Sequence, residues 1–166
     1  ALLGGKVLID GQPIHRPMAR NQRVAYIAEN PSQMMLFQDM SYLRNLTFCL
    51  PRQIDSWFRR RSIYRSLRRE LTPELGAVFD KDIRDLNTQE KYALIFRRGL
   101  LQQPRVGFFD QPFWGNDVLL QQHIERQVQL LLAKKIAVVV LIVGIYDAFP
   151  LAERTLIYKN GHLLTQ

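Results

Sequence analysis

A phosphate-binding loop would be the clearest sign of nucleotide chemistry, and the sequence lacks one. The pattern is G-x-x-x-x-G-K-[ST], in which backbone N–H groups and a helix N-terminus hold the phosphates. The nearest candidate, Gly4–Lys6, is followed by Val7, and no glycine precedes it at the required distance. The histidines do not have the spacing of metal ligands either. We therefore assign no role to His15, His123 or His162.

Basic residues are concentrated in one stretch. The formal net charge is +8 and the pI is near 10.0, which favours acidic partners such as phosphates, nucleic acid or an anionic membrane surface. The cluster consists of Arg59, Arg60, Arg61, Arg65, Arg68 and Arg69. Interleaved with Trp57, Phe58 and Tyr64, it could contact a nucleic-acid backbone. We favour a solvated helix face whose aromatic side chains pack in the core.

The bulk composition indicates one globular domain. A chain of 166 residues with 47% hydrophobic and 23% charged residues can bury a single core and is not typical of disorder. Cys49 has no partner for an intrachain disulfide, so a reducing, cytoplasmic setting is the default. No signal peptide is visible, and the longest apolar run, Ile136–Ile145, is shorter than the roughly 20 residues that span a bilayer. We expect a soluble or membrane-peripheral protein. Because the sequence begins at Ala1 rather than Met, this chain is compatible with being a piece of a longer protein.

Hydrophobic periodicity predicts short strands and helices in the first half. Strands are expected at Lys6–Asp10, before a turn at Gly11, and at Arg23–Ala28, where Pro31 stops the ladder. A short helix is expected within Met40–Leu50 and a longer one over Ile54–Leu71. The connector that follows, 71–85, has room for one helical turn after Pro73.

The second half alternates helix and strand, which indicates an α/β fold with right-handed crossovers. Val106–Asp110 is typical of a buried strand and the β-branched run Ile136–Val143 of a central parallel strand. Asn160–Gly161 predicts a hairpin turn. The expected elements are helix Asn87–Gln102, strand Val106–Asp110, helix Asp117–Lys134, strand Ile136–Val143 and hairpin Arg154–Leu164.

The segment Leu86–Pro112, LNTQEKYALIFRRGLLQQPRVGFFDQP, resembles the stretch of ABC ATPases that runs from the signature loop to the Walker B strand. Arg98 and Leu100 match the end of the family's helix, and Pro104 matches its connector. Val106–Phe109 matches the apolar strand. Asp110 and Pro112 match two positions of its Asp-Glu-Pro terminus.

Further segments resemble the same family in the same order. Glu29 stands at the Q-loop glutamine, and Asn45 at the Asn of the Val-x-Glu-Asn-Leu helix start. The matching segments are Gly5–Ile14 (antiparallel strands), Arg23–Pro31 (strand into the Q-loop), Met40–Phe48 (helix start), Phe113–Asp117 (D-loop) and Ala152–Leu164 (final strand and hairpin). The details at Glu29, Asn45 and Gly115–Val118 most resemble the second cassette of sugar-importer ATPases.

The resemblance implies a P-loop-NTPase-like α/β fold: a mostly parallel sheet with flanking helices and a small helical subdomain, lacking the Walker A segment. We expect a single, partial ABC-type domain over residues 1–166. The helical subdomain, about 32–85, is inserted between core 1–31 and core 86–166. In the family, the Walker A loop would lie upstream of residue 1, so either the gene product lacks it or this chain is a fragment.

The resemblance also implies a degenerate nucleotide site. Its positions are Glu29, Asp110, Gln111 and Asp117. Asp110 would hold Mg²⁺ if nucleotide binds, whereas Gln111 replaces the glutamate that polarises water and cannot accept a proton. We therefore predict no catalytic residue. The alternative is that Asp110 only ends a strand and caps a turn.

The signature loop and the switch histidine are altered as well. The signature positions are Asn87, Thr88, Gln89 and Glu90. We interpret them as a helix cap in which Asn87 and Glu90 form a capping box. Where the family has its switch histidine, this chain has Val143, Gly144 and Ile145.

These losses lead to three hypotheses. The first is a non-catalytic ABC cassette that contacts a membrane permease, a second cassette, or both, at the cytoplasmic membrane face. In the family, the region matching Glu29 to about Leu71 receives the permease, so Met34–Phe37 could serve that contact, although core packing is the commoner role of such residues.

The alternatives are a nucleic-acid-binding domain and a cassette that binds ATP but hydrolyses it slowly or not at all, its Walker A lying upstream. No cofactor is certain, and Mg-ATP is expected to bind weakly if at all. The edge left by the missing strands predicts a partner.

Overall fold

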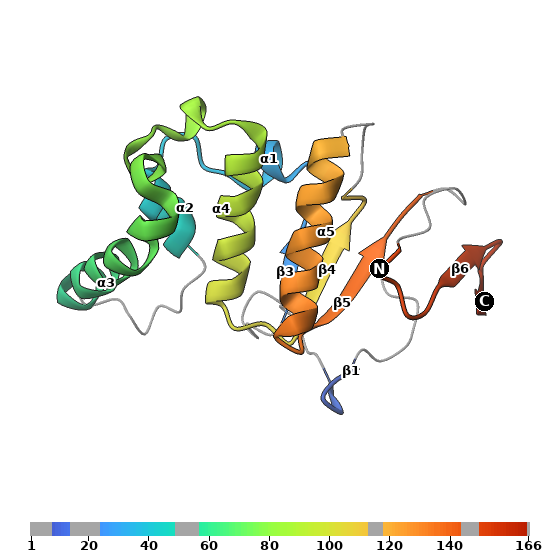
Figure 1. Ribbon diagram of the computed structural model, residues 1–166. Coiled ribbons are helices and arrows are strands. Elements are labelled where there is room, and N and C mark those ends of the chain that lie inside the picture. Colours follow the sequence, from blue (N-terminus) through green and yellow to red (C-terminus); the bar gives the residue numbers. More distant parts are fainter. Residues whose placement is uncertain (1–7, 14–23, 49–56, 113–117, 144–149, 166) are drawn as a thin grey trace.

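The computed structural model describes residues 8–13, 24–48, 57–112, 118–143 and 150–165. Its centre is a three-stranded parallel sheet of β3 (Val24–Ile27), β4 (Val106–Asp110) and β5 (Ala137–Leu141), in the order β3-β4-β5. Helices α4 (Thr88–Leu101) and α5 (Val118–Ala133) precede β4 and β5 respectively and lie along the sheet (Figure 1). The α/β order and the bounds of the strand at Val106–Asp110 confirm the sequence predictions.

The two faces of the sheet differ because alternate side chains point to opposite sides. Ala25, Ile27 and Phe109 are buried on the face that packs against α4 and α5. Close approach is possible because Gly99 of α4 meets Ala25, where an added Cβ would stand 3.2 Å from the alanine Cβ. Gly107 makes similar room for Leu131.

The opposite face is open among the described residues, which corrects one prediction. The run Ile136–Val143 was expected to form a central strand, but β4 is the central one and β5 lies at the edge of the described sheet. Val139 and Leu141 on this face are both 47% exposed. An apolar β-branched run indicates burial on both faces, but it does not determine which strands pair with it in the sheet.

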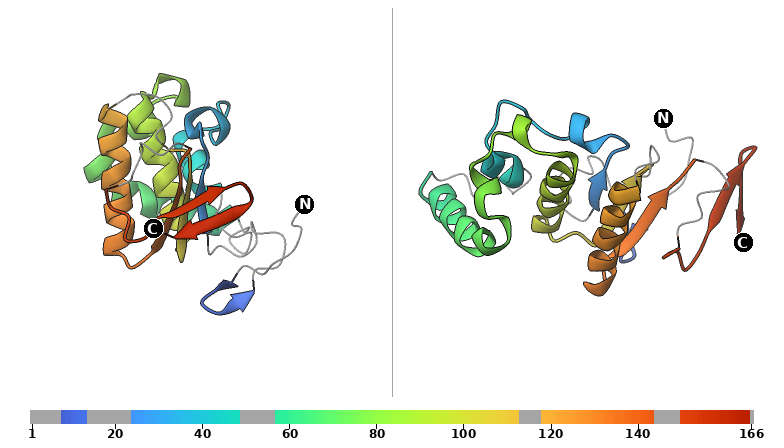
Figure 2. Two further views of the ribbon diagram at one scale, coloured as in Figure 1. Left: turned by 90° about the vertical axis from the view of Figure 1, so that its right-hand side faces the viewer. Right: turned by 45° about the horizontal axis from the view of Figure 1, so that its top comes forward.

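The described residues between β3 and α4 form helices and turns. The elements are α1 (Pro31–Met34), α2 (Tyr42–Thr47), α3 (Trp57–Leu75) and the 3₁₀ turns η3 (Gly76–Asp80) and η4 (Ile83–Asp85). The predicted end of the long helix at Leu71 is wrong, since α3 passes through Pro73 to Leu75. Proline removes one N–H, so near the end of a helix it can interrupt only the last turn. Figure 2 shows this helical group beside α4, away from β5.

One core joins the helical segment to the sheet. Tyr42 of α2, Ile83 of η4, Leu94 of α4 and Phe109 of β4 belong to the same buried cluster. The rings of Tyr42 and Phe79 meet edge to face, with centroids 5.2 Å apart.

Two hairpins complete the fold. They are β1 (Leu8–Ile9) with β2 (Gln12–Pro13), and β6 (Leu156–Lys159) with β7 (His162–Thr165). Both turns have two residues at positive φ: Asp10 and Gly11 at 52° and 73°, and Asn160 and Gly161 at 51° and 83°. This is the pattern of a type I′ turn, and it confirms both predicted turns. No helix in the described ranges is long and apolar enough to cross a membrane.

Candidate functional site at the carboxyl edge of the sheet

Three of the predicted nucleotide-site residues gather at one edge of the sheet. Parallel pairing places Ile27 opposite Phe109, so the ends of β3 and β4 lie side by side. Asp110 is the last residue of β4, Gln111 follows it, and Glu29 stands two residues beyond β3. All three are partly buried. Carboxyl edges of parallel strands are where α/β proteins place their ligand sites.

The carboxylate of Asp110 is already engaged by a neighbour on β3. The Tyr26 hydroxyl donates to Asp110 Oδ2 over 2.7 Å, and the Tyr26 ring stacks on Phe108 with centroids 5.9 Å apart. The hydrogen bond to Asp110 raises the pKa of Tyr26, helped by burial and by the negative charges of Asp110 and Glu29. The sequence motifs do not single out Tyr26. Its alternation with Ala25 and Ile27 was the available signal, because it places Tyr26 on the open face.

Gln111 is held by the backbone. It adopts φ 46°, in the left-handed region, and its N–H donates to the carbonyl of Leu141 over 2.9 Å. A non-glycine residue in this region is uncommon and is found at functional sites. An amide cannot act as a general base, so the Gln111 side chain cannot take up a proton in a reaction.

The described residues do not assemble a Mg²⁺ site. A metal of this kind prefers an octahedron of oxygen ligands, and Asp110 by itself supplies only a small part of that set. Within the described ranges, no group of three or more His, Cys, Asp or Glu side chains could hold an ion. Asp117 and the rest of 113–117 lie outside the described residues, as do Gly144 and Ile145. Val143, at the switch-histidine position, is exposed.

The signature-loop positions form the cap of α4, as predicted. Asn87 Oδ1 accepts from the Glu90 N–H, and Glu90 Oε2 accepts from the Asn87 N–H, each over 2.9 Å. Lys81 Nζ lies 2.7 Å from Glu90 Oε1. The pKa of Glu90 is lowered, first by Lys81 and then by the Asn87 N–H. Thr88 and Gln89 are exposed.

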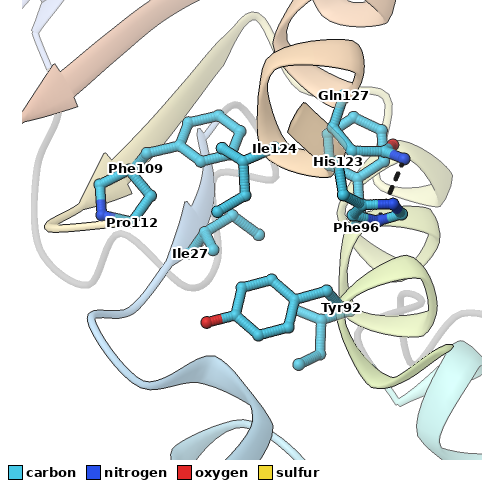
Figure 3. A pocket seen from close by; sticks show the side chains of 9 residues that line it. Ile27, Tyr92, Phe96, Phe109, Pro112, His123, Ile124 and Gln127 are labelled. Carbon is cyan, nitrogen blue, oxygen red and sulfur yellow. Dashed lines mark hydrogen bonds between the residues drawn. The ribbon is translucent and has the colours of Figure 1, made fainter. Parts of the chain in front are cut away.

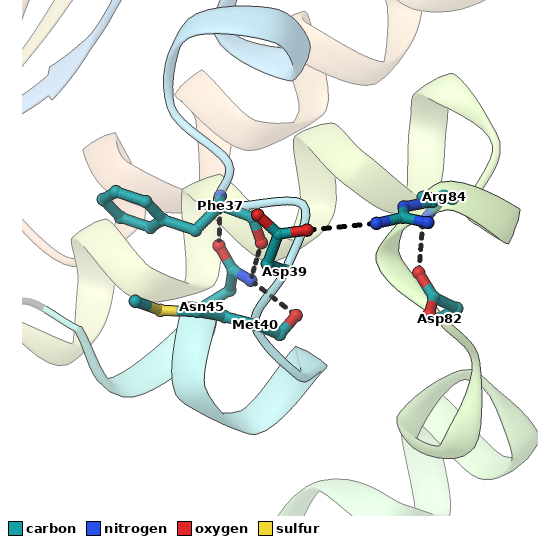
Figure 4. A network of polar contacts seen from close by, with 6 residues as sticks. All are labelled: Phe37, Asp39, Met40, Asn45, Asp82 and Arg84. Atoms are coloured by element: carbon teal, nitrogen blue, oxygen red, sulfur yellow. Dashed lines mark hydrogen bonds and ion pairs between the residues drawn. The ribbon is translucent and has the colours of Figure 1, made fainter.

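A second candidate surface lies after β3 and depends on Asn45 (Figure 4). This side chain is fully buried. It accepts from the Phe37 N–H over 2.9 Å and donates to the carbonyls of Phe37, Met40 and Ser41. Four hydrogen bonds from one amide therefore fix the shape of the loop 37–41.

Exposed apolar side chains lie in this loop and in the helical segments on either side of it. Met34 is 73% exposed, and Phe37 and Phe48 are exposed with ring centroids 4.5 Å apart. We call Met34, Phe37 and Phe48 the apolar patch. Of the residues predicted to serve a partner contact, Leu36 instead packs in the core with Met35 against it.

A polar cleft adjoins the loop and links it to η4. Its lining residues are Gln38, Asp39, Met40, Ser41, Lys81, Asp82 and Arg84. Arg84 Nη2 contacts Asp39 Oδ1 at 3.0 Å, and Asp82 Oδ1 accepts from the Arg84 N–H (Figure 4). Both ends of this ion pair are well exposed, so it adds little stability.

Arg98 ties α4 to the same segment. This guanidinium is 4% exposed and its Nη1 donates to the Met35 carbonyl over 2.7 Å. The contact spans 63 residues of sequence. This hydrogen bond therefore joins the segment after β3 directly to α4.

The apolar pocket between the sheet and helices α4 and α5 is interior packing (Figure 3). It is lined by Ile27, Tyr92, Ile95, Phe96, Phe109, Pro112, His123, Ile124 and Gln127. His123 lies 3.4 Å from the Gln127 amide, and its pKa is lowered by burial and by the nearby charges of Arg126 and Arg97. A histidine kept neutral against apolar neighbours gives this space no anion-binding character.

The arginine cluster lies on α3. Arg61, Arg65, Arg68 and Arg69 are exposed, and Tyr64 is half-buried with its hydroxyl 3.3 Å from Thr47 Oγ1. The side chains of Trp57 to Arg60 lie outside the described residues. For the described part, the pattern matches a solvated helix face.

Comparisons with known proteins agree with this architecture. No protein-family profile matches the chain. It is 25% identical to a putative ribose/galactose/methyl galactoside import ATP-binding protein of Pseudomonas fluorescens, over 97% of this chain and 33% of the relative. It is 28% identical to the molybdenum import ATP-binding protein ModC of Mycobacterium tuberculosis, over 96% and 43%. The chain thus spans between a third and a half of the length of these relatives.

Solved structures show the same fold. A dimeric ATP-binding cassette in a post-hydrolysis state with ADP and phosphate superposes with a TM-score of 0.68 at 19% identity, over 97% of this chain and 72% of that one. cbiO1 of Clostridium perfringens, part of an ABC transporter complex, gives 0.69 at 19% identity, over 98% and 65%. The fold is that of P-loop NTPases of the ABC ATPase type. In sequence and in fold the chain is therefore similar to ABC-type nucleotide-binding domains.

Proposed function

We propose that this chain is a cassette of an ABC transporter that works through contacts with a membrane permease and a partner cassette, without hydrolysing ATP efficiently. The observation that carries the proposal is the pair Asp110–Gln111 at the end of β4. The Tyr26 hydroxyl donates to the Asp110 carboxylate over 2.7 Å. The next residue, Gln111, offers an amide in place of a base. The relatives are named as ATP-binding proteins of import systems, which supports the transporter setting.

The helical segment after β3, about 32–85, serves in this proposal as the permease-facing subdomain. Asn45 holds the backbone of Phe37, one member of the apolar patch, so a partner would meet this residue in a preformed loop at low entropic cost. Arg98 would carry a displacement of this segment to α4. The cassette would be held peripherally at the cytoplasmic face of the membrane by the permease.

The first experiment is an Mg-ATP titration and ATPase assay of the full-length gene product, with Gln111→Glu as the matched variant. We expect no turnover above background in the unaltered protein. Turnover that appears only in Gln111→Glu would support the proposal by locating the loss at that position. Efficient turnover in the unaltered protein would overturn it. Binding of ATP without turnover would support the variant of the proposal in which an upstream segment supplies the Walker A loop.

The partner contact is tested by binding to a permease subunit co-produced with the protein. Met34→Glu and Phe37→Glu should each weaken binding about tenfold or more, because apolar anchors dominate such interfaces. Leu130→Glu, an exposed leucine on α5, is the control and should leave binding unchanged. Equal binding by all variants would count against the patch. Binding to RNA or DNA that falls steeply with salt, and is lost when Arg65 and Arg69 are replaced, would favour the nucleic-acid alternative.

A further inference from the structure

The exposed arginines of α3 lie on one side of that helix, because side chains three and four residues apart are neighbours on a helix surface. Among the α3 side chains that the structure describes, the acidic one is Glu70. Helical geometry places it on the other side, about two and a half turns after the first of these arginines. We call the four exposed residues the arginine face: Arg61, Arg65, Arg68 and Arg69.

The apolar side of α3 packs against the rest of the helical segment. Leu67 is buried and Leu71 packs against the buried core. The Tyr64 hydroxyl lies 3.3 Å from Thr47 Oγ1 of α2. The arginine face is therefore turned outward, on a helix at the outer end of the helical group (Figures 1 and 2).

The four charges of the arginine face are close enough to act together. A rise of 1.5 Å per residue separates Arg61 from Arg69 by about 12 Å along the helix axis, which is close to the Debye length of about 8–10 Å at physiological ionic strength. Such a cluster attracts a surface of opposite charge. Guanidinium groups also fit phosphate oxygens, with two donors to one phosphate.

An anionic membrane surface fits this face better than a nucleic acid does. Proteins that bind single strands stack the bases on exposed aromatic side chains, whereas Tyr64 is half-buried and directed to Thr47. A membrane surface requires only that basic side chains are exposed on one side of an element. The proposed function already places the chain at the cytoplasmic face of the membrane.

We propose that the arginine face binds the headgroup phosphates of anionic lipids and holds the helical segment against the membrane surface. This inference rests on the proposed function for its setting, and it adds an electrostatic contact with lipid to the apolar contact with the permease. Because the apolar residues of α3 face the protein, the helix stays outside the hydrocarbon layer. The contact is therefore electrostatic and weakens as salt rises.

The test is cosedimentation of the purified full-length protein with vesicles that contain no permease. We expect binding to vesicles of phosphatidylcholine mixed with phosphatidylglycerol, loss of binding at high salt, and none to phosphatidylcholine alone. Arg65→Gln/Arg69→Gln should weaken binding about tenfold or more, and Arg65→Lys/Arg69→Lys should retain most of it. The control, Lys134→Gln/Lys135→Gln, removes the same charge from two exposed lysines between α5 and β5 and should bind like the unaltered protein.

Three outcomes would overturn the proposal. Equal weakening by both glutamine variants would assign the binding to net charge, and equal binding by all variants would exclude the arginine face. Binding of RNA that depends on Arg65 and Arg69, without binding to anionic vesicles, would assign the face to nucleic acid. Soluble glycerol phosphate should not compete with the vesicles; if it does, the face is a site for single phosphates. Neither a permease nor ATP takes part, so failure here is separate from failure of the proposed function.

Discussion

At the residue scale, Asn87 and Glu90 show how positions of a nucleotide-binding motif can become a structural cap. Each side chain satisfies the other residue's backbone N–H, which would otherwise be unpaired at the start of α4. A cap of this kind is specified by residues three apart. This is why it could be predicted from the sequence alone.

Replacing Asn87 by alanine should therefore destabilise the protein. The expected loss is about 1 kcal/mol of the free energy of unfolding, or a fall in melting temperature of roughly 2–4 °C. Thr88→Ala is the control, because Thr88 is exposed in the same turn and is not the N-cap residue. Equal melting temperatures for all three proteins would contradict the capping role.

Glu90 makes part of this stability depend on pH. Lys81 and the Asn87 N–H hold the pKa of Glu90 below its ordinary value of 4.5. A carboxyl whose folded pKa is lowered contributes stability above its unfolded pKa, and that contribution is lost as pH falls through the folded pKa. The unaltered protein should thus be more stable than Glu90→Gln near neutral pH, and the difference should shrink in acid.

Urea unfolding of both proteins at several pH values measures this difference. Glu153→Gln, at an exposed position, serves as the control and should show no comparable pH-dependent loss. A difference between the unaltered protein and Glu90→Gln that stays constant from neutral to acid pH would refute the assignment of the ion pair.

At the element scale, Asn45 connects α2 to the loop 37–41 and so holds the backbone of Phe37, one member of the apolar patch. Asn45→Leu keeps the volume but leaves the Phe37 N–H and the Met40 carbonyl without their Asn45 partner, while the Phe37 carbonyl still accepts from the Met40 N–H. Each buried group left unsatisfied costs about 1–3 kcal/mol. We expect a total loss of about 3 kcal/mol or more in the free energy of unfolding and faster hydrogen exchange at Phe37.

Thr47→Val is the matched control on the same helix. It removes a hydroxyl that donates to the Leu43 carbonyl within the helix and does not reach the loop. It should leave the exchange of the Phe37 amide unchanged. If Asn45→Leu also leaves that amide protected, the loop is held by something other than Asn45.

At the scale of the whole molecule, local features were predictable and long-range ones were not. The β6–β7 turn follows from Asn160–Gly161, because only such residues accept positive φ at little cost. The contact between Tyr26 and Asp110 joins residues 84 apart, and it follows only from the register of two strands. The edge position of β5 likewise depends on which strands pair, which its own apolar residues do not encode.

The open sheet face has a consequence for the isolated 166-residue chain. Tyr26 on β3 and Val139 and Leu141 on β5 expose apolar surface on either side of Phe108 of β4, and contiguous patches of this kind mark interaction surfaces. The chain should therefore self-associate as its concentration rises. Val139→Lys/Leu141→Lys should keep it monomeric, because a charge on this face must be desolvated on contact.

Sedimentation velocity at several concentrations measures this association. Leu130→Lys/Leu132→Lys is the control: it places the same charges at exposed positions of α5 and should not prevent association. If the unaltered chain stays monomeric at every concentration, the open sheet face does not mediate self-association. The partner predicted from the open sheet would then need its own experimental support. If both double variants become monomeric, net charge explains the effect and the sheet face does not.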